Sequence, residues 1–202
     1  MSTALTEIAR ACAQCQQCGL HTQRTHSVFS DGNPQARIMV IGEGPGYYED
    51  QQGVPFVGKS GQLLTQMLAA IGLYRQKDVY IANIVKCRPP DNRKPTPEEM
   101  AACFDYLKAQ IQAVRPWILI LTGGTALEGI TGKKQGITRS RGQWFVWEGA
   151  GFPVDCVAIF HPSYLLRNPE RTPHSPKGLT WKDLKSVARR YAQLRQENPG
   201  AL

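Results

Sequence analysis

The chain has 202 residues, and 42% of them are hydrophobic, which is enough to bury a proper core in one large domain or two small ones. Its first twenty residues lack the unbroken apolar run of a secretory signal, and no later run approaches the length of a membrane span. These features argue against a membrane protein and predict a cytoplasmic one, while the net charge of +8 favours an anionic partner such as nucleic acid.

The first half of the chain contains two apolar segments, each followed by a helical pattern. The apolar segments predict strands at residues 36–42 and 78–85, because they are short and nearly continuous in hydrophobic residues. The helices are predicted at residues 60–72 and 96–114. Thr96 is a plausible N-cap of the second helix, since a proline and two glutamates follow it.

The second half repeats this alternation and ends in a helix. Strands are predicted at residues 116–124 and 154–160, with a short helix at 125–130 after the first of them. Residues 143–147 predict an extra strand that forms a hairpin with the last one. An amphipathic helix is expected at 181–196.

This order of elements predicts an α/β fold in three layers, α/β/α, around a central, mainly parallel sheet of four strands. We expect one domain over residues 1–202, because no linker or repeat divides the chain. In open α/β sheets the ligand crevice lies beyond the carboxyl ends of the strands. The glycine-rich and polar stretches follow these strand ends, so they are predicted to converge on one edge of the sheet.

The stretch GEGPG, residues 42–46, predicts a tight turn whose backbone can approach a ligand closely. Glu43, Glu49 and Asp50 place carboxylates beside this turn. Because such charges would repel a bare polyphosphate, we expect the pocket to take a neutral, planar group. Phe56 lies on the loop that follows, where its ring could lie flat against that group or anchor the core.

Two further polar residues stand at strand ends. Asn83 lies within an apolar strand, where a buried amide is costly unless its donor and acceptor are both satisfied. It could read the edge of a nucleobase or tie down a neighbouring loop. His161 directly follows the strand at 154–160, and it is either structural or a catalytic group that faces the glycines, the carboxylate and the amide.

A glycine-bounded basic stretch, GKKQGITRSRG, covers residues 132–142. It lies between apolar segments, which suits a loop that contacts phosphates, although an ordinary solvated surface is the alternative. Its cations are Lys133, Lys134, Arg139 and Arg141.

Six cysteines are present, and three of them fall in CAQCQQC, residues 12–18. Such a spacing fits a zinc finger, a disulfide, a redox motif or an iron-sulfur ligand set. In a reducing compartment, metal ligands or buried apolar residues are the more natural roles. Cys156 lies inside a predicted strand and is most simply a small apolar residue.

Three motifs together carry a family resemblance: GEGPGYYEDQQGVPFVG, NIVKCRPP and HPSYLLR, in that order. They closely resemble the iron-sulfur uracil-DNA glycosylases of family 4, from about Cys15 to Arg167 and on into the last helix. The resemblance implies release of uracil from single- and double-stranded DNA by cleavage of the N-glycosidic bond of a flipped-out deoxyuridine. It implies no strand cleavage and no divalent metal in the chemistry.

The resemblance also implies roles for the pocket residues. Phe56 would stack on uracil, and the Asn83 amide would bind O4 and the N3 proton. His161 would donate to O2 and stabilise the departing uracil anion. Glu43 would position or activate the attacking water, and Glu49 would fill the space beside uracil C5, where the methyl group of thymine would clash.

The DNA contacts implied by the resemblance lie outside the pocket. Leu165 would wedge into the gap left by the flipped base, and Arg167 would bind a phosphate, together with the basic loop. Gly44 stands where the family often has alanine, a difference that should leave the turn intact. A related branch forms a covalent adduct through a histidine in the basic loop, and this loop contains none.

The family's cysteine pattern assigns the ligands of a structural 4Fe-4S cluster that pins residues 12–24 to the sheet. Those ligands are Cys15, Cys18, Cys87 and Cys103. Cys12 is expected to be a non-ligand, because using it would shift the register away from Leu20 and Arg24. Spacing alone does not exclude tetrahedral zinc, so the metal rests on the resemblance.

Two other classes of protein fit the sequence less well. A non-catalytic nucleic-acid-binding module would not need Glu43, Phe56, Asn83 and His161 all intact. A metal-dependent nucleotide hydrolase would need a carboxylate cluster that the sequence lacks. We expect a monomer, and a sliding clamp as a partner has no support in the sequence.

Overall fold

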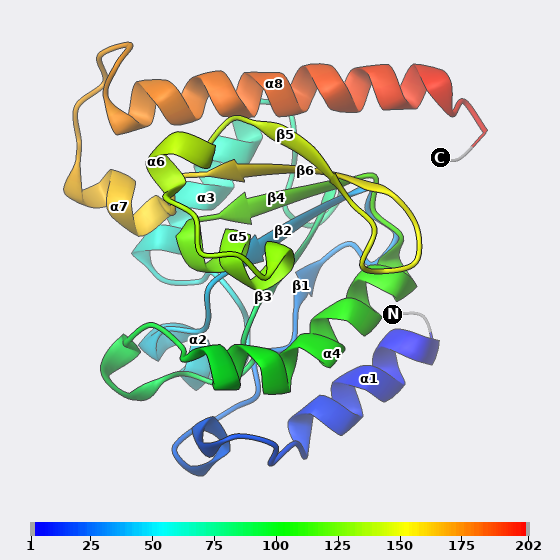
Figure 1. Ribbon diagram of the computed structural model, residues 1–202, viewed down its shortest axis with the longest axis vertical. Helices are drawn as coiled ribbons and strands as arrows, with labels where there is room; N and C mark the ends of the chain where they lie inside the picture. Colours follow the sequence, from blue (N-terminus) through cyan, green and yellow to red (C-terminus); the bar gives the residue numbers. More distant parts are fainter. Residues whose placement is uncertain (1–2, 201–202) are drawn as a thin grey trace.

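The computed structural model describes residues 3–200, and its centre is a six-stranded sheet with the strand order β1-β3-β2-β4-β6-β5 (Figure 1). Four of these strands, β3, β2, β4 and β6, pair in parallel, which confirms the predicted parallel core. The strands are β1 (Asp31–Gly32), β2 (Ile38–Gly42), β3 (Val79–Asn83), β4 (Ile118–Thr122), β5 (Trp144–Trp147) and β6 (Val154–Ile159).

The sheet is wider than the predicted four strands, because an antiparallel strand is added at each edge. β5 pairs with β6 in the hairpin expected from the sequence. β1 consists only of Asp31 and Gly32 and pairs antiparallel with β3. Two residues are too few for an alternating pattern to indicate a strand, so β1 was not predicted.

Helices cover both faces of the sheet, as the three-layer prediction requires (Figure 1). Successive residues of a strand point to opposite faces, so Met39 and Ile41 pack with α1, α4 and α5, while Ile38 and Val40 pack with α3 and α8. The helices are α1 (Thr3–Ala13), α2 (Tyr47–Gln52), α3 (Lys59–Ala69), α4 (Pro97–Val114), α5 (Gly124–Thr131), α6 (Ile137–Ser140), α7 (Pro162–Arg167) and α8 (Pro176–Glu197).

The starts of two long helices are set by side-chain caps. Thr96 forms the predicted cap of α4: its hydroxyl accepts from Glu99 N at 3.2 Å, and the Glu99 carboxylate accepts from Thr96 N at 2.8 Å. α8 begins five residues earlier than residue 181, because Ser175 caps it and Pro176 occupies its first turn. No helix in residues 3–200 is both long and apolar enough to cross a membrane.

α1 was not predicted from the sequence. The helix buries Leu5 and Cys12, and Ile8 and Ala9 pack against the same core, so the apolar spacing of one helical face was present in the sequence. It packs beside α4 and leads directly into the cysteine segment, followed by a short 3-10 turn at Gly19–Thr22. A second 3-10 turn, Pro90–Asn92, precedes α4.

Candidate functional site

The carboxyl ends of the parallel strands gather the predicted pocket residues at one edge of the sheet. β2 ends at Gly42, directly before Glu43, while β3 ends at Asn83 and β6 leads into His161. Gly42 has no side chain, and this allows its neighbours to meet. A Cβ atom there would lie 2.3 Å from Asn83 Oδ1 and 2.5 Å from Cζ of Phe56.

The Asn83 amide holds an unpaired acceptor at this edge of the sheet. Asn83 is 1% exposed and lies opposite Gly42 in the parallel register of β2 and β3. Its Oδ1 is buried and accepts no hydrogen bond from the described residues. Leaving such an acceptor unpaired costs about 1–3 kcal/mol, so a buried orphan at a strand end indicates a place for a ligand's donor.

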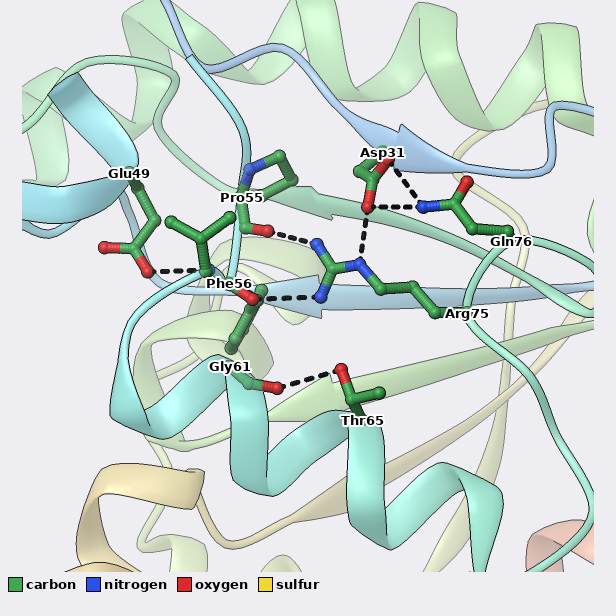
Figure 2. A network of polar contacts seen from close by, with 9 residues as sticks. Asp31, Glu49, Pro55, Phe56, Gly61, Thr65, Arg75 and Gln76 are labelled. Atoms are coloured by element: carbon green, nitrogen blue, oxygen red, sulfur yellow. Dashed lines mark hydrogen bonds and ion pairs between the residues drawn. The ribbon is translucent and has the colours of Figure 1, made fainter. Parts of the chain in front are cut away.

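Phe56 is held in place through its own backbone (Figure 2). Its φ of +54° lies in the left-handed region, which an aromatic residue rarely adopts without support. Arg75 gives that support, because its guanidinium donates to Phe56 O at 2.9 Å and to Pro55 O, while Asp31 accepts from its Nε at 2.5 Å. α3 passes so close that a Cβ on Gly61 would lie 1.9 Å from Phe56 O.

Glu49 joins the two loops that frame the pocket. One carboxylate oxygen accepts from Val57 N at 3.0 Å and from Gly58 N at 2.9 Å, and the other accepts from Gly46 N at 3.1 Å. These three contacts fix the loop that carries Phe56 against the turn that follows β2. This clamping role was not predicted from the sequence.

Asp50 points away from the pocket, toward the N-terminal segment. It is 2% exposed and accepts from Thr25 N at 2.9 Å and from His26 N at 3.4 Å. The two neighbouring carboxylates therefore serve different parts of the molecule: Glu49 frames the pocket, and Asp50 anchors the segment that follows the first cysteines.

His161 caps α7 through its own ring. Nδ1 accepts from Ser163 N at 3.1 Å, which makes Nδ1 the acceptor and places the proton of a neutral ring on Nε2. Burial lowers the pKa of His161 to about 4, and the Arg167 guanidinium acts in the same direction, while Glu49 opposes it. At neutral pH the ring is therefore an uncharged donor, and its centre lies 6.0 Å from that of Phe56.

Glu43 has a partner that the sequence analysis missed. Thr125, in the first turn of α5, donates from its hydroxyl to Glu43 Oε2 at 2.5 Å and is itself buried. The contact fixes one carboxylate oxygen, and it joins the end of β2 to the end of β4. Gly123 stands between β4 and α5, and a Cβ there would lie 3.1 Å from His161 Cβ. The polar threonine after an apolar strand was the signal available in the sequence.

Of the two residues in the helix after His161 that were expected to contact DNA, Leu165 is buried and Arg167 is exposed. Leu165 is only 2% exposed, because it lies in a groove between α3, α7 and α8 with Met67 and Leu184. In this conformation it is not at the surface, where a wedge would have to be. Its neighbour Leu166 is 43% exposed, and Arg167 is exposed at the end of α7.

The cations of the basic loop differ in their exposure. Three of them are exposed: Lys133, Lys134 and Arg139. Arg141 instead forms a buried ion pair with Asp183, with Nε at 2.7 Å from Oδ2, and also donates to Leu179 O at 3.0 Å. Arg141 therefore fastens the loop to α8, and its guanidinium is already used. Ile137 lies close to Gly124, which brings α6 to the pocket edge of the sheet.

The cysteines predicted as ligands line one cavity between the N-terminal segment, the end of β3 and α4. They are Cys15, Cys18, Cys87 and Cys103. Cys12 also lines this cavity, 3.2 Å from Ser27 Oγ. Cys156 is fully buried in the core, as the sequence predicts. Within residues 3–200, no three His, Cys, Asp or Glu side chains converge closely enough to hold a single metal ion.

The cavity supplies donors to sulfur. Arg24 donates to Cys87 Sγ at 3.3 Å and to Cys15 O at 2.9 Å, and the backbone N–H of Lys86 donates to Cys103 Sγ at 3.3 Å. Burial raises the pKa of Cys103 to about 12, against the opposing charge of Lys86. Because burial disfavours the thiolate form, these cysteines would ionise only when a positively charged metal group is bound to them. The N–H donors would then hydrogen-bond to the metal-bound sulfur atoms, so the cavity fits a metal group with thiolate ligands.

Several known proteins similar to this chain are uracil-DNA glycosylases. A sequence profile for the Uracil DNA glycosylase superfamily matches residues 29–185. The type-4 uracil-DNA glycosylase of Thermotoga maritima is 50% identical over 156 residues, which is 77% of this chain and 79% of that protein. The type-4 enzyme of Archaeoglobus fulgidus is 44% identical over 170 residues (82% and 85%), and that of Saccharolobus solfataricus is 40% identical over 166 residues (80% and 77%).

Replacing Arg75 tests whether it fixes the Phe56 loop. In Arg75→Met the carbonyl groups of Pro55 and Phe56 lose their donor, so the amide hydrogens of Val57 and Gly58 should exchange roughly tenfold faster in a hydrogen-exchange measurement. The exposed Arg189→Met is the matched control and should leave them unchanged. Equal exchange in both variants would show that Arg75 does not hold the loop.

Proposed function

The chain belongs to the uracil DNA glycosylase superfamily, and we propose that it removes uracil from DNA by hydrolysing the N-glycosidic bond of deoxyuridine. The product is an abasic site, which starts base excision repair. The observation that carries the proposal is the buried, unpaired Oδ1 of Asn83 beside a side-chain-free Gly42. That oxygen needs a donor, and the N3–H of uracil supplies one.

Base recognition follows from the direction of the Asn83 hydrogen bonds. Oδ1 would accept from N3–H of uracil, and the amide nitrogen would donate to O4. Cytosine presents an acceptor at N3 and a donor at its exocyclic amine, so the same amide would face two mismatched groups. The Phe56 ring, held by Arg75, would stack on the base.

His161 would assist the departure of uracil. As the glycosidic bond breaks, negative charge builds on uracil O2, and the Nε2–H of a neutral ring would donate to that oxygen. The donor is oriented in advance, because Nδ1 is fixed by Ser163 N. A prealigned donor in a buried site stabilises charge that develops in the transition state.

Glu43 would act on the other side of the bond. Thr125 holds one of its carboxylate oxygens, which leaves the other to orient a water molecule toward the sugar carbon. The carboxylate charge would also favour the positive charge that develops on the sugar. Glu49, clamped by three backbone N–H groups, would occupy the space beside uracil C5 and so reject thymine. Gly44 would form part of the turn between Glu43 and Glu49.

The DNA strand would be held mainly through its phosphates. Lys133, Lys134, Arg139 and Arg167 are exposed and form no ion pair among residues 3–200, and the net charge is +8. Phosphate contacts of this kind do not depend on sequence or on pairing, so we propose that single- and double-stranded DNA are both bound, more weakly at high salt.

A 4Fe-4S cluster is proposed for the cysteine cavity, bound by Cys15, Cys18, Cys87 and Cys103. The choice of a cluster over tetrahedral zinc, which also takes four thiolates, rests on the similarity to type-4 uracil-DNA glycosylases rather than on the cavity. The cluster would act as a cross-link that docks residues 12–24 onto the rest of one glycosylase domain. It supplies no chemistry at the glycosidic bond.

The direct test is release of free uracil from a uracil-containing oligonucleotide by cluster-loaded protein in the presence of EDTA. Asn83→Ala should reduce kcat/KM by roughly a hundredfold or more, because two hydrogen bonds to the base are lost. Asn198→Ala, which changes an exposed amide at the end of α8, is the control and should keep full activity. A loaded wild-type preparation that leaves the oligonucleotide intact after alkali treatment would overturn the proposal.

The lowered pKa of His161, about 4, predicts an unusual pH dependence. Its ring should stay neutral as pH falls through the ordinary histidine range, so the NMR titration of His161 should have its midpoint about two units below those of exposed histidines. Uracil release should decline through this group only near pH 4, when a proton on Nδ1 breaks the contact with Ser163. A His161 midpoint near 6.5 would contradict this.

Two serine substitutions separate the proposed ligands from the spare cysteine. Cys15→Ser should lose bound iron and the visible absorbance of the cluster, and it should unfold at a lower temperature. Cys12→Ser should keep the bound iron and the visible absorbance, because Cys12 faces Ser27 and is not a proposed ligand. Iron analysis and absorbance spectra of the two variants measure this, and the reverse pattern would reassign the ligands.

A further inference from the structure

Lys86 is the one fully buried cation among residues 3–200. It lies between the proposed base-reading residue and a proposed cluster ligand, three positions after Asn83 and one before Cys87. Its Nζ donates to the main-chain oxygen of Asn83 at 2.6 Å. Its backbone is tied in as well, since its carbonyl accepts from Val28 N at 2.7 Å.

Lys86 has no carboxylate partner within residues 3–200. None of the ion pairs there includes its ammonium group, and the backbone N–H of the same residue donates to Cys103 Sγ at 3.3 Å. Its side chain lines the cysteine cavity. A buried ammonium group without a counter-charge is strongly unfavourable, so the anion that keeps Lys86 in place must come from that cavity.

The two cations of the cavity match the charge of the proposed cluster. Four thiolates around a doubly positive iron-sulfur core form a dianion. Lys86 supplies one compensating charge, and Arg24, which contacts Cys87 Sγ, supplies the other. Burying a dianion with two adjacent cations avoids the cost of burying either charge alone.

Resting on the proposed function, we infer that Lys86 is a positioning residue that couples the cluster to base recognition. The thiolate charge holds the ammonium group, and the ammonium group holds the Asn83 carbonyl at the end of β3. The position of the Asn83 side-chain amide, which would bind uracil, thereby depends on Lys86 and on the cluster that holds Lys86 in place. Lys86 touches no substrate atom, and its effect passes through Asn83.

Lys86→Met removes both the charge and the donor with little change in volume. Loss of a nearby positive charge should shift the reduction potential of the bound cluster to more negative values, because the reduced form is the more anionic. The activity kcat/KM should fall about tenfold or more, and this loss should largely disappear when Asn83→Ala is also present. The control is Lys77→Met, which replaces an exposed lysine just before β3 and should change neither the reduction potential nor kcat/KM.

The outcomes are distinct. An unchanged potential, or an equal loss of activity with and without the Asn83 side chain, would overturn the coupling. The potential is measured on the protein alone, so it still tests Lys86 if the wild type releases no uracil, a result that would instead refute the proposed function. Lys86→Gln keeps a donor but loses the charge, so it should shift the potential and lose less activity than Lys86→Met.

A measurement on the wild type covers the case in which neither variant folds. Ile84 N donates to Gly42 O and Val85 N donates to Glu43 O, next to Asn83. Removing iron with a chelator should loosen the hold of Lys86, so these two amide hydrogens should exchange faster than in the loaded protein. Identical exchange rates in the loaded and the stripped protein would overturn the proposal.

Discussion

The parallel pairing of β2 with β3 is the constraint on which the rest of the site depends. Its register sets Gly42 opposite Asn83, and Asn83 Oδ1 and the Phe56 ring both reach the space that a side chain on Gly42 would fill. A shift by one residue would turn Asn83 to the other face of the sheet. Both strands are buried from end to end, so their continuous apolar pattern alone does not select this register.

The pocket is stabilised by polar contacts that come from outside it. Arg75 and Glu49 act on main-chain groups of the Phe56 loop, and Thr125 acts on the carboxylate of Glu43. Lys86 acts on the carbonyl of Asn83. Phe56, Glu43 and Asn83 are thus each held by a residue that takes no part in binding the base, which keeps a site built on loop ends in one geometry.

The sequence predicted the parts of this molecule that depend on local pattern. Four apolar runs were enough to predict the parallel core and its two covering layers, and Thr96 with its glutamates indicated the start of α4. Strand ends also pointed to Asn83 and His161. Contacts between distant residues left no such pattern: Arg75 meets Asp31 across 44 positions, and Arg141 meets Asp183 across 42. Burial of Leu165 likewise depends on how α7 docks against α3 and α8.

The close approach at Gly42 has a consequence for how such a protein can lose its activity. A single added methyl group at this position would collide with both Asn83 and Phe56, although it removes none of the groups that bind or react. Sequences in this superfamily could therefore become inactive while every recognised functional residue remains. A glycine, which contributes no chemistry of its own, is then as informative for recognising an active member as the residues that surround it.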